Sequence, residues 1–277
     1  PGFNLRIAKW SKVLGFKNHY YISPQIWAWK ESRIKEIKRD IDKMYVILPF
    51  EKTFYEDKHH FPVSFVGHPL IDAIQAHPVI DDATFRKENQ LNDLPIIALL
   101  PGSRKQEITK MLSVMLSVAD DFKRYQFVIA GAPSQEYSFY QQFITSDNIK
   151  FLSNKTYDLL QHATAALVTS GTATLETALF KVPEVVCYKG NWISYQIAKR
   201  IITLKYISLV NLIMDKEVVT ELIQDDCNTK RIASELQKIL EPEHRKIVLE
   251  NYRILEEKLG GKGASSTTAK LIVADLK

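Results

Sequence analysis

IIALLPGSRKQEI, residues 96–108, combines an apolar run, a glycine turn and a charged segment that is compatible with a helix. The run Ile96–Leu100 predicts a buried parallel strand, because strands that are covered on both faces are continuously apolar. Gly102 permits a sharp turn, and Ser103 is expected to cap the helix that follows. Backbone N–H groups and the Arg104 side chain would then converge on one point, which favours an anion site at a helix N-terminus. A strand–helix joint that binds nothing is the alternative for this stretch alone.

A second turn of the same form lies in AALVTSGTATLE, residues 165–176. An apolar strand leads into Ser170-Gly171-Thr172, where glycine would let the backbone approach a diphosphate and the two hydroxyls would donate hydrogen bonds. Glu176 lies one turn further, where a carboxylate suits the hydroxyls of a ribose. A capped helix with a solvent-facing glutamate is the plainer alternative. Two such turns in one α/β unit favour a nucleotide site.

The composition is typical of a globular protein of one or two domains, with 277 residues, 45% of them hydrophobic and 25% charged. No uncharged apolar stretch reaches the ~18 residues of a transmembrane helix, and no signal peptide is recognisable. Cys187 and Cys227 match no metal or redox spacing, so we expect reduced thiols in a cytosolic protein. Because the chain begins at Pro1 without a methionine, it is expected to be a fragment.

The positive charge is concentrated at the front of the chain. The net charge is +5, and residues 1–70 hold 12 Lys and Arg against 7 Asp and Glu, whereas the remainder is balanced. Such a segment favours an anionic membrane surface, a phosphorylated substrate or nucleic acid. An ordinary solvated surface is the alternative.

From Ile96 onward, regular alternation of strands and helices predicts a doubly wound parallel sheet. The strands are expected near residues 96–100, 126–131, 149–152, 164–169 and 184–188, and the helices near 105–121, 134–145, 156–162 and 171–181.

The first 70 residues also alternate, but the set is too small for a whole Rossmann-like domain. SPQIWAWK, residues 23–30, is expected to be a loop at the carboxyl end of a strand, where α/β proteins bind ligands. The polar stretch after Leu70 is expected to be an inter-domain linker. The expected elements are helices at Phe3–Leu14, Ser32–Asp40 and Glu51–Lys58, and strands at His19–Ile22, Lys43–Leu48 and Ser64–Val66.

The later part of the chain is expected to be helical. Asn191–Met214 contains no acidic residue, and its aromatic and basic residues predict an amphipathic helix on a membrane or beside an acyl chain. A helix that faces the core and exposes its lysines is the alternative. Pro242–Leu259 predicts a long helix, and Ser265 or Ser266 is expected to cap a last helix that ends at Leu276.

Several classes of chemistry lack their motifs. The seven histidines form no H-x-x-x-H or Cys/His cluster, which argues against a zinc site. The sequence has no G-x-S-x-G elbow and no G-x-G-x-x-G fingerprint, which argues against an α/β-hydrolase and a dinucleotide dehydrogenase. Arg104 and helix dipoles could instead neutralise a diphosphate leaving group without a metal.

Seven blocks occur in an order that resembles the lipid-A-disaccharide synthase family, bacterial glycosyltransferases of the GT-B architecture. The resemblance extends from Pro1 to about Leu240 and more loosely to the end. The blocks are YYISPQIWAWKESRIKEI, YVILPFEKTFYE, FVGHPLID, ALLPGSRKQEI, VTSGTATLETALFKVPEVVCY, YISLVNLI and EVVTELIQDDC.

The resemblance implies an inverting glycosyl transfer in lipid A biosynthesis. A 2,3-diacylglucosamine unit would move from UDP to 2,3-diacylglucosamine 1-phosphate, giving a β-1,6-linked disaccharide and UDP. No metal or organic cofactor and no nucleic-acid partner is implied. The resemblance places the protein in the cytoplasm of a Gram-negative bacterium, peripherally on the anionic inner membrane, and is compatible with a homodimer.

The resemblance also implies roles for particular residues. Arg104, with Gly102 and Ser103, would contact the UDP phosphates, and the Ser170-Gly171-Thr172 turn would bind the diphosphate. Glu176 would hold the ribose, and Asn211 in YISLVNLI would contact substrate.

The departure from the family is at the front. Roughly the first third of the family's chain precedes the P-x-F-N segment that residues 1–4 match, and that part carries a carboxylate thought to be the general base. The catalytic base is therefore expected upstream of Pro1, and no residue here is assigned that role. We expect a GT-B fold of two Rossmann-like domains whose N-terminal domain is incomplete. Residues 1–70 would belong to the acceptor side, 71–240 to UDP-sugar binding and 241–277 to C-terminal helices.

Two alternatives remain open from the sequence. The first is another UDP-sugar enzyme of this architecture, either a peptidoglycan N-acetylglucosaminyltransferase or a UDP-N-acetylglucosamine 2-epimerase. The SPQIWAWK and VGHP blocks argue against both. The second is a chain that binds UDP without catalysis.

Overall fold

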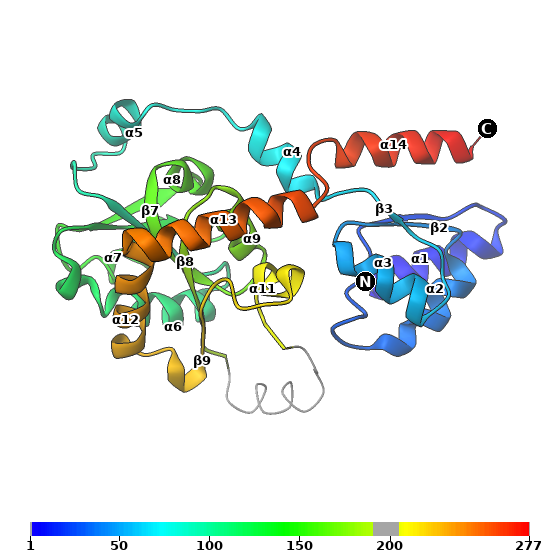
Figure 1. The fold of residues 1–277 in the computed structure, drawn as a ribbon, viewed down its shortest axis with the longest axis horizontal. Helices are drawn as coiled ribbons and strands as arrows, with labels where there is room; N and C mark the ends of the chain where they lie inside the picture. Colours follow the sequence, from blue (N-terminus) through cyan, green and yellow to red (C-terminus); the bar gives the residue numbers. More distant parts are fainter. Residues whose placement is uncertain (1, 191–204, 277) are drawn as a thin grey trace. The chain divides into compact units, whose positions relative to one another are not determined.

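A computed structural model describes residues 2–190 and 205–276 of the chain (Figure 1). These residues form two units. Unit 1 comprises residues 2–75 and 255–276, and unit 2 comprises residues 76–190 and 205–254. The first 14 residues of the expected amphipathic segment Asn191–Met214 lie outside the described part. Within the described residues, no helix is long and apolar enough to cross a membrane.

Unit 2 is built on a six-stranded parallel sheet with the order β6-β5-β4-β7-β8-β9. The chain moves outward from β4 to β6, then returns to the other side of β4 and continues to β9. The order therefore reverses between β4 and β7, and α/β sheets bind ligands at the carboxyl ends of strands at such a point. The strands are β4 Ile96–Leu100, β5 Gln126–Gly131, β6 Ile149–Ser153, β7 Ala163–Thr169, β8 Glu184–Tyr188 and β9 Glu221–Ile223.

Alternate strand residues face opposite layers of helices. Ile97 and Leu99 of β4 pack in a cluster with apolar side chains of α6 and α12, whereas Ala98 and Leu100 pack with α8. Both faces of the sheet are therefore buried, as the continuously apolar strand sequences predict. The helices of unit 2 are α5 Asp82–Glu88, α6 Lys105–Leu116, η3 Ala119–Phe122, α7 Tyr137–Gln141, α8 Thr156–His162, α9 Thr172–Leu179, α11 Leu209–Met214, η4 Gln224–Asp226, α12 Thr229–Leu240 and most of α13, Pro242–Lys258.

Two expected helices of unit 2 are shorter than their sequences predict. The segment 105–121 ends its α-helix at Leu116 and continues as a separate 3-10 turn. The segment 134–145 is helical only over Tyr137–Gln141. The Ser134 hydroxyl donates to the Ser103 carbonyl 3.0 Å away, and this bond holds residue 134 in the preceding loop rather than in a helix.

Unit 1 contains a three-stranded parallel sheet in the order β1-β2-β3. Its apolar cluster joins the sheet to α1 and α2 through Leu5, Ile37 and Met44, among others. The elements are α1 Gly2–Val13, β1 His19–Tyr21, η1 Glu31–Arg33, α2 Ile34–Asp40, β2 Lys43–Val46, α3 Pro49–Thr53, the π-helical η2 Phe54–Lys58, β3 Ser64–Phe65, α4 Pro69–Ala76 and α14 Ala264–Asp275.

The C-terminal segment packs within unit 1. The His68 N–H donates to the Leu259 carbonyl at 3.0 Å, and Asp275 forms an ion pair with Lys17 at 2.6 Å. The expected serine cap of the last helix is wrong. Helix α14 instead follows Gly263 in a left-handed conformation, and the Asp72 carboxylate accepts the Gly263 N–H at 2.6 Å.

The stretch after Leu70 is also more regular than the expected linker. Helix α4 occupies its start, and α5 follows after a short connection. Asp81 caps α5 by accepting the Thr84 N–H at 2.9 Å, so this polar stretch contains a helix signal.

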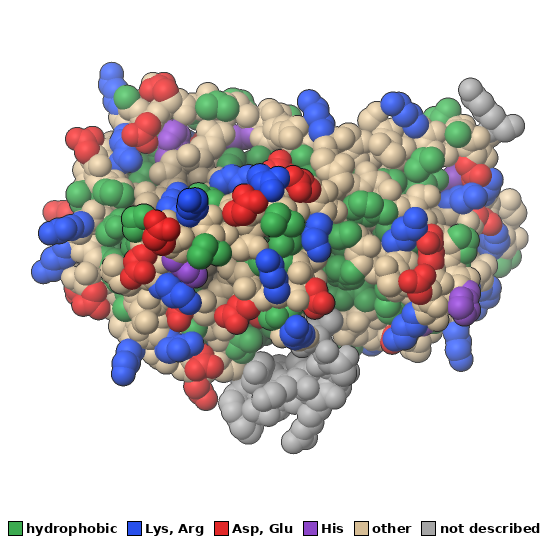
Figure 2. All heavy atoms as spheres, viewed as in Figure 1, with side chains coloured by type: hydrophobic (Ala, Val, Ile, Leu, Met, Phe, Trp, Pro, Cys, Tyr) green, Lys and Arg blue, Asp and Glu red, His purple; other side chains and the backbone are tan. Residues whose placement is uncertain are grey.

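On the face shown in Figure 2, Lys and Arg side chains are interspersed with Asp and Glu.

Candidate nucleotide site

A cavity of about 450 Å³ lies at the carboxyl ends of β4, β5 and β7, where the strand order reverses. Its volume is within the range of small-molecule sites, about 300–1,000 Å³. All the residues that line it belong to unit 2. The cavity brings together both predicted glycine turns, and seven of the predicted site residues line it: Gly102, Ser103, Arg104, Ser170, Gly171, Thr172 and Glu176.

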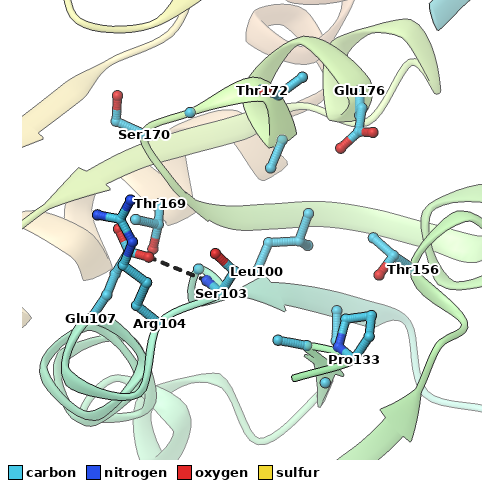
Figure 3. Close-up of a pocket in the computed structure, with 16 residues that line it drawn as sticks. Leu100, Ser103, Arg104, Glu107, Pro133, Thr156, Thr169, Ser170, Thr172 and Glu176 are labelled. Atoms are coloured by element: carbon cyan, nitrogen blue, oxygen red, sulfur yellow. Dashed lines mark hydrogen bonds between the residues drawn. The ribbon is translucent and has the colours of Figure 1, made fainter. Parts of the chain in front are cut away.

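The first turn depends on a glycine. Gly102 has a φ of +101°, and a Cβ atom placed there would lie 2.3 Å from Oε2 of Glu107. Glu107 folds back from the first turn of α6, and its Oε2 accepts the Ser103 N–H at 3.2 Å (Figure 3). The expected Ser103 cap is therefore wrong. Arg104 occupies the N-cap position, where its guanidinium cannot cap the helix because it has no hydrogen-bond acceptor.

Arg104 supplies a positive charge at this turn. Its exposed side chain lines the cavity, and in the view of Figure 3 it lies on the opposite side from Glu176. No described residue forms an ion pair or hydrogen bond with its guanidinium. An exposed guanidinium with unused donors at a helix N-terminus is suited to bind a phosphate.

The second turn places an open backbone at the start of α9. Gly171 is the N-cap residue, and no atom of the described part of the chain lies within 4 Å of a Cβ atom built there. The first N–H groups of a helix lack the usual partner one turn earlier. In α9 the Thr174 N–H donates to the Gly171 carbonyl at 3.3 Å, whereas those of Thr172 and Ala173 have no partner among the described residues and remain available to a ligand. Ser170 differs from expectation, because its hydroxyl donates to the Ile207 carbonyl at 3.0 Å and so fixes the chain before α11.

Glu176 is held by a tyrosine that the sequence did not indicate. The Tyr157 hydroxyl donates to Oε1 of Glu176 at 2.8 Å. Burial raises the pKa of Tyr157, and the neighbouring carboxylate raises it further, so this hydroxyl stays protonated and keeps donating. The other Glu176 oxygen remains for a ligand in the cavity.

Thr169 is a second residue that sequence reasoning missed. It is the last residue of β7, only 4% exposed, and its hydroxyl has no hydrogen-bond partner in the described part of the chain. Because buried hydroxyls are normally bonded, this hydroxyl would be satisfied by a ligand oxygen. Its position at the end of a strand beside the switch point was the available signal.

Asn211 does not line the cavity. Its side chain is fully buried, and its amide nitrogen donates to the Val219 carbonyl at 2.8 Å and to Oε1 of Glu221 at 2.9 Å. Its oxygen accepts the N–H groups of Val218 and Val219 at 2.7 and 3.0 Å. Every polar atom of the side chain is thus used within the fold, which conflicts with the predicted contact to substrate.

Metal ligands are not gathered at the site. Among residues 2–190 and 205–276, no group of three or more His, Cys, Asp or Glu side chains could hold a metal ion. Arg104 and the helix N-termini are therefore the positive groups that the described cavity offers to an anion.

The chain is similar to a known family over nearly its whole length. A family model described as lipid-A-disaccharide synthetase matches residues 1–273. A lipid-A-disaccharide synthase from Syntrophus aciditrophicus is 40% identical over an alignment of 285 residues, which covers 100% of this chain and 74% of that protein.

Solved structures with low sequence identity share the fold. The UDP-N-acetylglucosamine 2-epimerase from Neisseria meningitidis bound to UDP-N-acetylglucosamine has a TM-score of 0.60 at 13% identity and covers 98% of this chain and 72% of its own. The S. aureus MnaA–UDP co-structure has a TM-score of 0.61 at 11% identity, over 96% of this chain and 68% of the other. The expected α/β fold class of the GT-B type is confirmed.

Proposed function

The chain belongs to the lipid-A-disaccharide synthase family, and from this premise we propose that the unit 2 cavity binds the UDP part of a UDP-2,3-diacylglucosamine donor. The family is one of glycosyltransferases that make the lipid A disaccharide. One observation carries the proposal: two strand-to-helix glycine turns flank a single cavity where the strand order reverses. Such turns expose backbone N–H groups to a diphosphate.

The reaction we propose is an inverting transfer to 2,3-diacylglucosamine 1-phosphate. The acceptor's 6-hydroxyl oxygen would form a bond to the donor's anomeric carbon while the bond from that carbon to UDP breaks. UDP would leave with the bonding electrons, and the hydroxyl proton would pass to a base. No residue of this chain is assigned as that base, so the roles below concern the nucleotide.

Each nucleotide contact follows from the geometry of the cavity. Arg104 and the N-terminus of α9 would bind the diphosphate and offset the charge that develops as UDP leaves. Thr169 would give its unused hydroxyl to a phosphate oxygen. Glu176, oriented by Tyr157, would accept hydrogen bonds from the ribose hydroxyls.

The test is calorimetric titration of the chain with UDP, in parallel with ADP and inorganic pyrophosphate. We expect saturable binding of one UDP per chain, weaker binding of ADP and much weaker binding of pyrophosphate. A lack of saturable UDP binding would refute the proposal, and equal affinity for all three ligands would leave only an anion site. Product formation from donor and acceptor then separates catalysis from the alternative of UDP binding alone.

The similarity to solved 2-epimerases does not indicate that this chain is an epimerase, because similarity at 11–13% identity shows the fold only. The same assay decides this point, because an epimerase would convert UDP-N-acetylglucosamine without an acceptor. Conversion of that sugar nucleotide by the chain alone would support the epimerase alternative.

We also propose that unit 1 faces the cytoplasmic surface of the inner membrane. Large apolar side chains on and just after α1 are exposed, and no acidic residue occurs before Glu31. Apolar side chains flanked by lysines are typical of a surface that lies on anionic lipid. These side chains include Phe3, Ile7, Trp10, Val13, Leu14 and Phe16. A homodimer would cover the same surface, and sedimentation velocity without lipid tests that alternative.

A further inference from the structure

Unit 1 contains a second cavity, of about 440 Å³, beside the loop that follows β1. The carboxyl end of a parallel strand is the usual place for a ligand in an α/β unit. All the lining residues are described and belong to unit 1. Those that matter here are Asn4, Tyr20, Gln25, Trp29 and Arg33.

A buried carboxylate fixes the wall of this cavity. Glu51 is only 1% exposed, and its Oε1 accepts the Ser23 hydroxyl at 2.5 Å and the Trp27 indole N–H at 3.1 Å. Its Oε2 accepts the backbone N–H groups of Leu48 and Ile47 at 3.0 and 3.2 Å. Glu51 thus caps the start of α3 and also holds the Ser23 and Trp27 side chains in place, so the wall of the cavity has a fixed geometry before a ligand arrives.

The charge around the cavity is positive. Arg33 is half-buried in its lining, and its guanidinium forms no ion pair or hydrogen bond with a described residue. No acidic side chain of residues 2–190 and 205–276 lines the cavity. The acid nearest to Arg33 along the chain, Glu31, is paired with Lys58 at 2.7 Å and His59 at 3.0 Å. A half-buried guanidinium without a counter-ion favours a bound phosphate, which it can contact through two parallel hydrogen bonds.

The neighbouring groups suit a sugar attached to that phosphate. Trp29 is 50% exposed, and the Lys30 ammonium lies 4.2 Å from its ring centroid. An exposed indole offers a rigid apolar surface with a polar edge, against which the C–H face of a pyranose can pack. The amides of Asn4 and Gln25 can both donate to and accept from sugar hydroxyls.

We propose that this cavity binds a hexosamine 1-phosphate, with the phosphate on Arg33 and the sugar against Trp29. The identification of this ligand as the headgroup of the acceptor rests on the function proposed above. Phosphate binding to Arg33 does not depend on that function. The cavity would therefore select an acceptor that carries a phosphomonoester over an unphosphorylated one.

The test uses soluble glucosamine 1-phosphate, glucosamine and inorganic phosphate as probes, each titrated into the chain and followed by NMR. We expect saturable shifts of the Trp29 indole and Arg33 side-chain signals with glucosamine 1-phosphate. Inorganic phosphate should bind at least about fivefold more weakly, and glucosamine should not saturate. Equal affinity for phosphate and glucosamine 1-phosphate would refute the sugar part of the proposal.

Matched variants separate this site from a general charge effect. Arg33→Ala and Trp29→Ala should each weaken the binding of glucosamine 1-phosphate about tenfold or more, a loss of affinity typical of charged or stacked contacts. Arg39→Ala should leave it unchanged, because Arg39 pairs with Asp40 at 2.6 Å and does not line the cavity. Trp10→Ala is the matching aromatic control, since Trp10 is exposed elsewhere on α1.

UDP affinity and melting temperature are measured on every variant. If the unaltered chain binds UDP but not glucosamine 1-phosphate, this inference is wrong and the proposed function stands. If the unaltered chain does not bind UDP, the proposed function is wrong. An Arg33→Ala variant that is folded and binds glucosamine 1-phosphate as the unaltered chain does would also overturn the inference.

Discussion

Arg104 is the residue on which nucleotide binding depends most directly. Its guanidinium has no described partner, so replacing it by alanine removes a ligand contact without breaking an internal one. One charge-assisted phosphate contact contributes ~1.5–3 kcal/mol, so Arg104→Ala should weaken UDP binding by about 10- to 140-fold. Calorimetry measures this change, and exposed Arg124 supplies a control with the same loss of charge. Equal UDP affinity in the two variants would exclude Arg104 from the site.

Glu184 gives a prediction about stability rather than binding. It is completely buried at the start of β8, where its neighbours include the buried Tyr252 side chain and the Glu221 carboxylate. Burial raises its pKa well above the ordinary value. The folded state therefore favours the protonated carboxyl. The free energy of unfolding is highest below the ordinary pKa of glutamate, and it falls as pH rises from that value toward the raised pKa of Glu184 in the folded state.

Glu184→Gln should remove this dependence. The variant should melt at a higher temperature than the unaltered chain at about pH 7, and the difference should shrink toward about pH 4, since each pH unit between the two pKa values costs about 1.4 kcal/mol. Thermal melts across this range measure the effect. Exposed Glu217→Gln is the control and should show no such trend. A constant difference at all pH values would mean that Glu184 titrates normally.

Single residues differ in how far the sequence could place them. Gly102 and Arg104 were predictable, because a turn between an apolar strand and a helix constrains both locally. Thr169 and Tyr157 were not, because their roles depend on strand order and on which helix packs beside α9. Asn211 shows the opposite difficulty: a polar residue within an apolar run resembles a ligand contact, yet its hydrogen bonds all serve the fold.

The turn between β4 and α6 is the element whose shape the site requires. Gly102→Ala would place a Cβ atom at a positive φ and against the Glu107 carboxylate. We expect a loss of ~1–2 kcal/mol of folding stability and weaker UDP binding. Gly171→Ala is the informative comparison, because the backbone of Gly171 is extended and no described residue would contact the added methyl group. If Gly102→Ala melts and binds UDP as the unaltered chain does, the turn tolerates a side chain.

Elements were predicted well where burial on both faces determined their sequence. The five long strands of unit 2 occur where their apolar runs indicated. The sixth strand, β9, was missed because it has three residues and an interrupted apolar pattern. The end of the 105–121 segment and the helix at 134–145 were overestimated, because hydrogen bonds from loop residues compete with helix formation there.

At the scale of the whole molecule, the distribution of charged groups predicts how the nucleotide is held. The described residues offer no metal-binding cluster, and the positive groups at the cavity are Arg104 and helix N-termini. UDP affinity should therefore agree within about twofold in EDTA and in magnesium, once the binding of magnesium to free UDP is included. Calorimetry in both buffers tests this. Binding that requires magnesium would indicate a metal ligand outside the groups considered.

The whole molecule also carries its excess positive charge in residues 1–70, next to exposed apolar side chains. Trp29 is exposed, whereas Trp27 donates its indole N–H to buried Glu51 and packs against Phe50. Lys35 and Lys38 on α2 are exposed and, among described residues, form no ion pair. Unit 1 therefore has both parts of a peripheral membrane surface, exposed apolar side chains and exposed positive charge.

We expect the chain to co-sediment with anionic vesicles at low salt and to dissociate at high salt, because screening weakens attraction between exposed charges and lipid. Each Lys or Arg near the surface contributes about 1 kcal/mol, so neutralising Lys35, Lys38 and Arg39 together should reduce binding by at least tenfold. Neutralising Lys123, Lys230 and Arg231, which are exposed in unit 2, changes the net charge equally and should have much less effect. Absent binding at low salt, or equal losses in the two triple variants, would refute a membrane surface on unit 1.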